Sequence, residues 1–498
     1  MKPLKVLMLG WEFPPFITGG LGTACYGLTK AMDHLGCKIT FVLPKSISGQ
    51  HASHVTLRSP GDVSTDGPEE PVAEDEAPPP VPARQVEQDN PESSTEKILK
   101  VLQQVDFLEL PIEVPSVYDT PEQAAREISS NPQSIWFLRE QLKQHGTDAL
   151  PEGTVDQLLT EVIPEAPMHE PEESGGTDHE EKKSGDYGGD LFEEAQRYAR
   201  FALDASRNVD FDIIHAHDWL TYAGGLAVAR LSGKPLVVHV HSTEFDRSGE
   251  HVNQPVYDIE RRGMHGAMRV IAVSQLTKNI IVNRYGIHPD KVDVVYNGVE
   301  FQKTEQPLVE IHKQDKIVLY FGRITMQKGP EYFIAAAKRV LEVMDNVKFV
   351  VAGSGDLAAR MIEMAAENGI GHKVLFTGFL RGKDIERVFS MADMFVMPSV
   401  SEPFGIAPLE AMSYDVPVLI SKSSGVSEVL THALKVDFWD VDDMADKIIA
   451  VLKYPPLSKT LKEGGRFEVR QLTWDGAARR CIQVYEEALS QMTLQVAP

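Results

Sequence analysis

The chain has 498 residues, of which 42% are hydrophobic, and it carries a formal net charge of −24. This length predicts at least two domains, and the negative charge argues against nucleic acid or an anionic membrane surface as a partner. No run of about 18 apolar residues occurs, so we expect no membrane span. The three cysteines lack metal-ligand spacing, which favours a reducing cytoplasm over a disulfide framework.

The N-terminal segment predicts a β-loop-α-β unit. A short apolar strand over 5–10 is followed by a Gly-rich loop, a helix over 24–36 and a second strand over 38–44. This order is typical of the start of a doubly wound parallel sheet.

The composition changes between about residues 46 and 190. Two stretches, about 59–96 and 151–190, are acidic, rich in Pro or Gly and poor in aromatic residues. Such segments cannot bury enough apolar surface to offset the entropy lost on ordering. We therefore expect a long, partly disordered insertion in the N-terminal lobe, with a separate folded domain as the alternative.

Strands and helices alternate again after residue 190. A polar stretch near 302–314 reads as a linker between two such series. The fold class is therefore α/β, with two Rossmann-like αβα lobes facing across a cleft. We expect the active site in that cleft, at the carboxyl ends of the strands. The expected boundaries are an N-terminal lobe over 1–300, a C-terminal lobe over 312–475 and a final helix over 476–498.

Glycines follow the first strand directly. Gly19 and Gly20 would allow a ligand to approach the backbone, next to a helix N-terminus that attracts anions. The string is not GxGxxG, so a dinucleotide fingerprint is absent. A tight turn is the alternative.

Histidines occur twice in an alternating pattern at strand ends, as His215-Ala-His217-Asp218 and His239-Val-His241. Alternate residues of a strand share a face, so four imidazoles would lie together. A four-histidine metal site is one alternative. We favour no metal, with His241 and Asp218 reaching the cleft and the other histidines packing inside.

Charged residues mark two strand ends of the second lobe. Arg323 and Lys328 follow one strand, where two fixed cations suit a departing diphosphate. Glu402 and Glu410 flank a Gly turn, and carboxylates are good acceptors for sugar and ribose hydroxyls. The alternatives are a solvated ion pair and a favourable charge at a helix start.

Together these motifs resemble a known family. Gly-Gly-Leu at 19–21, HAHDW at 215–219, the R-x4-K pair and SEPFGIAPLE at 401–410 occur in the order found in retaining GT-B glycosyltransferases of family 4. They are also similar to the glycogen and starch synthases of family 5. The closing segment, 472–489, resembles the part of those enzymes that crosses back to the first lobe. The resemblance covers the chain apart from about 46–190.

The resemblance implies a hexosyltransferase that takes a sugar, expected to be glucose, from UDP- or ADP-glucose to a glucan or other sugar acceptor. It needs no metal, because cations and helix N-termini neutralise the diphosphate. Arg323 and Lys328 would contact the diphosphate, Glu402 the transferred sugar and Glu410 the ribose. Further implied contacts are the donor phosphates for Gly19 and Gly20, the sugar pocket for His241 and Asp218, and backbone amides from Phe404, Gly405 and Ile406.

One position departs from the family pattern. Bacterial glycogen synthases carry a lysine two residues before the paired glycines, where this chain has Ile17. This difference weakens the assignment to ADP-glucose. The alternatives are a mannosyl- or glucosyltransferase acting on a small molecule or lipid, and a non-catalytic sugar-binding protein.

Overall fold

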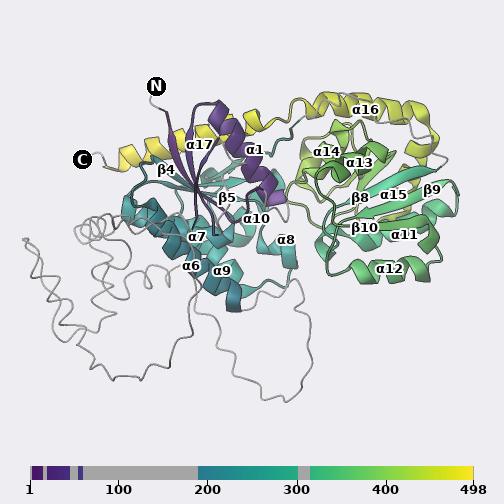
Figure 1. The fold of residues 1–498 in the computed structure, drawn as a ribbon, viewed down its shortest axis with the longest axis horizontal. Helices are drawn as coiled ribbons and strands as arrows, with labels where there is room; N and C mark the ends of the chain where they lie inside the picture. Colours follow the sequence, from purple (N-terminus) through teal and green to yellow (C-terminus); the bar gives the residue numbers. More distant parts are fainter. Residues whose placement is uncertain (1–2, 15–19, 45–53, 60–188, 301–314, 497–498) are drawn as a thin grey trace, which may run out of the picture.

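The structure is a computed structural model that describes residues 3–14, 20–44, 54–59, 189–300 and 315–496. It consists of two α/β lobes lying side by side (Figure 1). The expected insertion, except for its ends, and the expected linker lie outside the described residues.

The N-terminal lobe is built on seven parallel strands in the order β3-β2-β1-β4-β5-β6-β7. The register places His217 of β4 directly beside His239 of β5. The short strand β3 was not predicted. The strands are β1 (Lys5–Leu9), β2 (Lys38–Val42), β3 (Thr56–Arg58), β4 (Ile213–His217), β5 (Leu236–Val240), β6 (Arg269–Ala272) and β7 (Val292–Val294).

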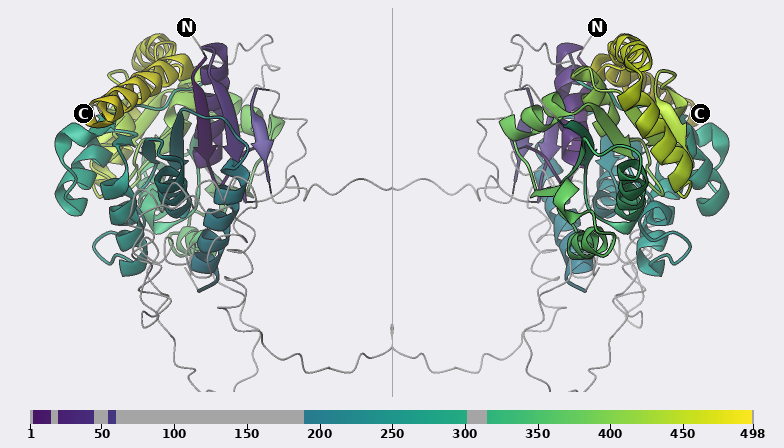
Figure 2. Two further views of the ribbon diagram at one scale, coloured as in Figure 1. Left: turned by 90° about the vertical axis from the view of Figure 1, so that its left-hand side faces the viewer. Right: turned by 90° about the vertical axis from the view of Figure 1, so that its right-hand side faces the viewer.

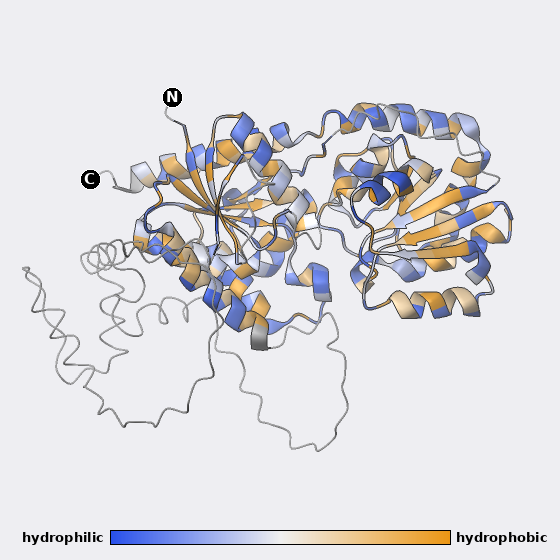
Figure 3. Ribbon diagram, viewed as in Figure 1, coloured by the Kyte–Doolittle hydropathy of each residue, from blue (hydrophilic) through white to orange (hydrophobic). Residues whose placement is uncertain are grey.

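Both faces of this sheet are covered by helices, because its strands are apolar on both sides (Figure 3). Leu7 and Ile214 pack under one layer of helices, whereas Met8 and Ile213 pack under the other. The first layer consists of α6 (Gly189–Ser206), α7 (Trp219–Ser232), α9 (Gln254–Gly266) and α10 (Gln275–Tyr285); the second consists of α1 (Gly20–His34) and α17 (Trp474–Val496).

The C-terminal lobe has six parallel strands in the order β10-β9-β8-β11-β12-β13. They are β8 (Lys316–Phe321), β9 (Val347–Ala352), β10 (Val374–Gly378), β11 (Met394–Met397), β12 (Val418–Ser421) and β13 (Leu434–Val436). One face packs on α11 (Pro330–Leu341), α12 (Ala358–Glu367) and α15 (Val441–Lys453), and the other on α13 (Lys383–Met391) and α14 (Ala407–Ser413). Helix α16 (Pro455–Val469) contacts both α14 and α15.

The last helix returns to the first lobe. Helix α17 lies beside α1 and the N-terminal strands in Figures 1 and 2. Its residues Ala478, Tyr485 and Ala488 are buried there. Cys481 of the same helix is buried and unpaired, as are Cys25 and Cys37. None of the helices in the described ranges is long and apolar enough to cross a membrane.

Candidate functional site

The two lobes meet at the carboxyl ends of their strands. The loop after β5 leads into the short helix α8 (Glu244–Ser248), which lies against the 3-10 turn η4 (Met326–Lys328) after β8. The Ser401 hydroxyl, after β11, donates a hydrogen bond to Asp246 Oδ1 over 2.7 Å. Residues from both sheets therefore share one surface, as expected for two facing lobes.

A second contact between the lobes involves the Glu428 carboxylate. It accepts hydrogen bonds from the backbone N–H groups of Gln275 (2.8 Å) and Leu276 (2.7 Å), at the start of α10. A carboxylate at a helix N-terminus is favourable, because it pairs with free N–H groups. Close to it, a Cβ at Gly425 would lie 2.5 Å from the Cβ of Ser274, so this approach requires glycine.

Lys328 and Glu402 form an ion pair at this surface. Lys328 Nζ lies 2.5 Å from Glu402 Oε2, although 74 residues separate the two in sequence. They are neighbours because β8 and β11 are adjacent strands. The Ser399 hydroxyl donates to the same carboxylate oxygen over 3.4 Å. The structure thus brings together two of the residues singled out in the sequence.

Arg323 lies in the same loop as Lys328, and its side chain is exposed. Its backbone carbonyl accepts a hydrogen bond from the Tyr320 hydroxyl over 2.7 Å, which holds the loop against β8. Burial raises the pKa of Tyr320, and the charges of Glu402 and Glu331 add to this rise. Glu402, Glu331 and Arg323 therefore lie within electrostatic reach of one tyrosine.

Sequence reasoning missed Glu331. Its Oε2 is buried and has no hydrogen-bond partner among the described residues, and the same holds for Thr325 Oγ1. Desolvation raises the pKa of Glu331. Its position in the first turn of α11 looked like an ordinary helix-start charge.

The Gly turn after Glu402 contains one residue with a positive φ. Gly405 adopts a φ of 100°, and a Cβ there would lie 3.1 Å from the Glu402 Cγ. The Phe404 ring is buried, 6.0 Å from the ring of Tyr296. Ile406 is the N-cap of α14, and Glu410 lies in its first turn. Desolvation raises the pKa of Glu410 to about 7.

On the N-terminal lobe, Asp218 holds the backbone of His241. Asp218 Oδ1 accepts the backbone N–H of His241 over 2.7 Å, and Asp218 itself has a positive φ of 57°. Desolvation raises the pKa of its carboxyl to about 7, in spite of this hydrogen bond. Gly20 begins α1 and is exposed, with open space where a Cβ would stand. Gly19 lies outside the described residues.

A buried charged network behind α8 was also missed. Arg247 pairs with Glu244 and with Glu260, whose carboxylate also accepts from Tyr285. Asp246 Oδ2 accepts from the backbone N–H of Thr243 over 2.8 Å and from its hydroxyl over 2.7 Å. The only signal in the sequence is the spacing of Thr243 and Asp246, which is typical of a helix start.

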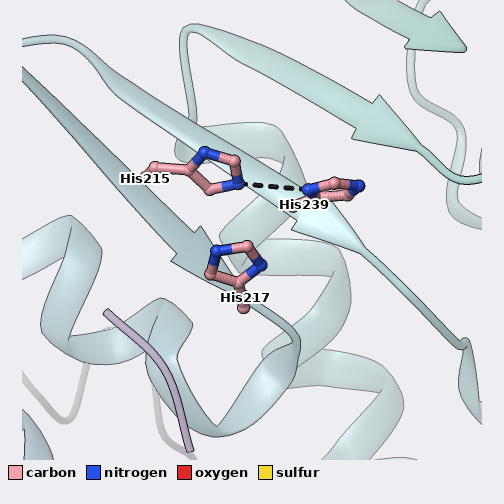
Figure 4. Close-up of side chains that lie close together, drawn as sticks. All are labelled: His215, His217 and His239. Carbon is pink, nitrogen blue, oxygen red and sulfur yellow. Dashed lines mark hydrogen bonds between the residues drawn. The ribbon is translucent and has the colours of Figure 1, made fainter. Parts of the chain in front are cut away.

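The four histidines do lie together, and three of them form a candidate metal centre. Figure 4 shows the rings of His215, His217 and His239 around a common space, with one ligand nitrogen of each within 4.8 Å of the others. His215 Nε2 is 3.2 Å from His239 Nδ1, and His217 Nδ1 is 2.9 Å from His241 Nε2. Burial lowers the pKa of all four, to about 3 for His215 and His241.

Ligation through the Nδ1 atoms of His217 and His239 would leave two ring N–H groups without acceptors. Ligating histidines normally donate their second ring N–H to an acceptor. If His217 and His239 were ligands through Nδ1, both would carry the proton on Nε2. Both Nε2 atoms are buried without a partner in the described part of the chain, and that of His239 points away from the other rings (Figure 4).

Comparison with known proteins identifies the family. The chain is 32% identical over 301 residues to an uncharacterized glycosyltransferase of Methanocaldococcus jannaschii, which covers 57% of this chain and 77% of that protein. Family models for Glycosyltransferase Family 4, Glycosyl transferases group 1 and the starch synthase catalytic domain match residues 163–303, 301–467 and 5–81. The chain is a glycosyltransferase.

Two more relatives of this glycosyltransferase are named for a specific activity. A D-inositol 3-phosphate glycosyltransferase of Catenulispora acidiphila is 28% identical over 305 residues, covering 56% of this chain and 73% of that protein. Glycogen synthase of Mycobacterium tuberculosis is 25% identical over 291 residues, covering 57% and 70%. The glycosyltransferase is therefore an enzyme, and the alternative of a non-catalytic sugar-binding protein is set aside.

Solved structures confirm the GT-B fold of this glycosyltransferase. Sucrose-phosphate synthase of Thermosynechococcus elongatus superposes with a TM-score of 0.60 at 16% identity, covering 98% of this chain and all of that one. HepE of Anabaena, solved with UDP and glucose, gives 0.59 at 14% identity, covering 97% and 100%.

A surface hollow of about 680 Å³ lies elsewhere on the glycosyltransferase, at the amino-terminal edge of the C-terminal sheet. Two of its basic residues are paired with acids, Lys316 with Asp393 and Arg466 with Asp415. The hollow is lined by none of the expected site residues, so its size does not identify it as the catalytic site.

Proposed function

We propose that the enzyme is a retaining hexosyltransferase that moves glucose from UDP- or ADP-glucose to a glucan or another sugar acceptor. HepE, a neighbour in fold, was solved with UDP and glucose, and one relative is a glycogen synthase. The observation that carries the proposal is the pairing of Lys328 with Glu402 at the strand ends where the lobes meet. Free thiols in the core suit a cytoplasmic location.

In this proposal Arg323 and Lys328 stabilise the leaving diphosphate. Negative charge grows on the phosphate oxygen as the glycosidic bond breaks, so fixed cations bind the transition state more strongly than the ground state. Lys328 is paired with Glu402 at 2.5 Å and is held by the turn η4. Binding of a diphosphate would give the ammonium group a second anion, and Glu402 would be left to accept sugar hydroxyls.

The remaining residues would bind the rest of the donor. The backbone amides of Phe404, Gly405 and Ile406 would donate to the donor, in a turn that Gly405 permits through its positive φ. Glu410 would accept from the ribose hydroxyls, because an ionised carboxylate offers two acceptor oxygens.

The first lobe would contribute the sugar pocket and one phosphate contact. His241 and Asp218 would line the pocket, with Asp218 fixing the backbone of His241. Gly19 and Gly20 would approach the donor phosphates at the N-terminus of α1. Cations and helix N–H groups would carry the phosphate charge, so we propose a reaction without a metal cofactor.

A second candidate differs only in the acceptor. The relative named as a D-inositol 3-phosphate glycosyltransferase favours a small phosphorylated polyol, with the same donor chemistry. The lobe that would bind the acceptor includes the insertion, most of which lies outside the described residues.

A donor and acceptor panel tests the proposal. The full chain is incubated with UDP-glucose, ADP-glucose or GDP-mannose, with glycogen or inositol 3-phosphate as acceptor, and nucleotide release is measured. We expect release with a glucose donor, and proton NMR of the product should show the anomeric configuration of the donor. Turnover of GDP-mannose alone would overturn the choice of sugar. An inverted product would overturn the retaining mechanism.

The panel needs a matched pair of lysine variants. Lys328→Ala removes the proposed diphosphate cation. Lys316→Ala removes a lysine that pairs with Asp393 at the opposite edge of the same sheet. Only the first should strongly lower turnover; equal activity in the two variants would overturn the proposed role of Lys328.

A further inference from the structure

His217 holds the ring of His241 through one hydrogen bond. His217 Nδ1 lies 2.9 Å from His241 Nε2, and no other hydrogen bond of the His241 ring occurs among the described residues. The ring of His239 stacks on His241 with centroids 4.2 Å apart, which fixes the plane of the ring. Because burial keeps all four imidazoles neutral, each ring has one N–H and one bare nitrogen.

Two proton arrangements are compatible with this bond. If His241 Nε2 donates, His217 Nδ1 is the acceptor and the proton of His217 lies on Nε2. That N–H would be buried without an acceptor. If His217 Nδ1 donates, that Nε2 is bare. An orphaned buried donor is rarer in proteins than an under-satisfied acceptor. The second arrangement is therefore favoured, and it places the proton of His241 on Nδ1.

The pair of His215 and His239 can also be arranged so that the unpartnered buried nitrogen carries no proton. The His215 Nδ1 contacts the Tyr485 hydroxyl, and this hydroxyl also lies 3.9 Å from Met32 Sδ, to which it can donate. His215 Nδ1 can then donate to the tyrosine oxygen, and its Nε2 accepts from His239 Nδ1. The buried Nε2 of His239 is again the bare nitrogen.

We infer that His217 is a positioning residue that fixes His241 in the Nδ1–H tautomer, so that His241 presents a hydrogen-bond donor to a sugar oxygen. The inference rests on the proposed function, which places His241 in the sugar pocket. His217 itself is fully buried, so it would act through His241. The substrate group at this position would be an acceptor oxygen, such as a hydroxyl or ring oxygen of the transferred sugar.

Two substitutions of similar size test the inference. An asparagine amide places its N–H₂ near the position of a histidine Nδ1, so His217→Asn keeps a donor toward His241. His217→Leu keeps the volume and removes the donor. We expect His217→Leu to lower kcat on the order of tenfold, the size of one lost hydrogen bond, and His217→Asn to restore most of it.

A double-mutant cycle separates positioning from general destabilisation. If His217 acts only through His241, His217→Leu should have no further effect on kcat in a His241→Ala background. His215→Leu is the matched control, because His215 is equally buried but bonds Tyr485 and His239 instead of His241. Thermal melting of each variant shows whether it is folded. Additive losses in the cycle would overturn the inference.

A spectroscopic readout is independent of turnover. In full-length protein labelled with ¹⁵N-histidine, the His241 signal, identified by its loss in His241→Gln, should show the Nδ1–H pattern. It should shift toward the other tautomer in His217→Leu. A wild-type Nε2–H pattern would overturn the inference even if the enzyme is active. If the NMR pattern is the expected one but no sugar nucleotide is turned over, the proposed function is refuted and the tautomer assignment stands.

Discussion

The strand ends of the two lobes differ in charge. Those of the C-terminal lobe carry Arg323, Lys328 and Glu402, with an ion pair between the last two. Those of the N-terminal lobe carry four imidazoles that burial keeps neutral, and the carboxyl of Asp218, whose pKa desolvation raises to about 7. Among the residues singled out for the site, those of the C-terminal lobe carry fixed charges and those of the N-terminal lobe are mostly uncharged; behind them, the N-terminal lobe also carries the buried ion pairs of Arg247 with Glu244 and Glu260.

This difference matches the two halves of a sugar nucleotide. A diphosphate that gains charge needs cations that are already in place, whereas a sugar is neutral and is recognised by directed donors and acceptors. The predictions below change one side of this comparison at a time.

The largest expected effect is a loss of kcat in variants of the charged residues of the C-terminal lobe. Lys328→Ala should lower kcat by on the order of 10²–10³ with little change in KM, because the lost contact strengthens in the transition state. Arg323→Lys should also lose activity, since an ammonium group does not reproduce the planar guanidinium fork. Steady-state kinetics with the accepted donor measures both. Near-wild-type turnover in Lys328→Ala would mean that the ion pair is only a surface contact.

The Lys328–Glu402 pair predicts non-additive losses. Glu402 is buried, so Lys328→Ala leaves a carboxylate without its partner. Lys328→Ala combined with Glu402→Gln should therefore be less destabilised than the sum of the single variants, as measured by chemical denaturation. Additive unfolding free energies would show that the two groups do not interact.

In the N-terminal lobe, Asp218 should contribute to the free energy of unfolding. Asp218→Ala removes the acceptor of the His241 N–H and places alanine at a positive φ. We expect a loss of about 2–3 kcal/mol in unfolding free energy. Asp218→Asn keeps an acceptor oxygen and tolerates positive φ better, so it should lose much less. Equal losses in the two variants would contradict this account.

The fold was largely predictable from the sequence, because buried parallel strands give short apolar runs at regular spacing. The sequence gives no periodic signal for helix α10, because Ile280, Ile281 and Val282 are consecutive and its apolar residues do not follow a helical period. Strand β3 has only three residues, and none of them is fully buried.

The site was predictable only in part. The residues of the charged motifs could be selected because of their spacing, but the pairing of Lys328 with Glu402 depends on which strands are adjacent. The α8 network could not be predicted, since the contact of Asp246 with Ser401 joins residues 155 positions apart. The hydrogen bond between His217 and His241 likewise depends on the register of β4 and β5.

A pH-dependent effect on stability is expected at Glu410. Its folded pKa, about 7, exceeds the ordinary value of 4.5, so the folded state binds the proton more tightly than the unfolded chain. Stability from this group is present in full below about pH 4.5 and is lost as the pH rises through 7. Wild-type protein should therefore lose about 2–3 kcal/mol more than Glu410→Gln between pH 5 and pH 8.

The exposed carboxylate of Glu363, paired with Arg360 on the surface of α12, provides the control for that experiment. Denaturant midpoints of Glu363→Gln should follow the wild type across the same pH range. Parallel curves for Glu410→Gln and wild type would show that Glu410 is well solvated in the folded protein.

No effect is expected from metal removal. The cations that would stabilise the diphosphate are side chains, so EDTA should leave kcat unchanged. The imidazoles of the other lobe are hydrogen-bonded to one another at 2.9 Å and 3.2 Å, and ligation through those nitrogens would leave two buried N–H groups without acceptors. Added zinc should therefore not raise the melting temperature. One equivalent of zinc that survives dialysis in wild type and is lost in His215→Leu would contradict the neutral hydrogen-bonded cluster, and with it the contrast between the two lobes.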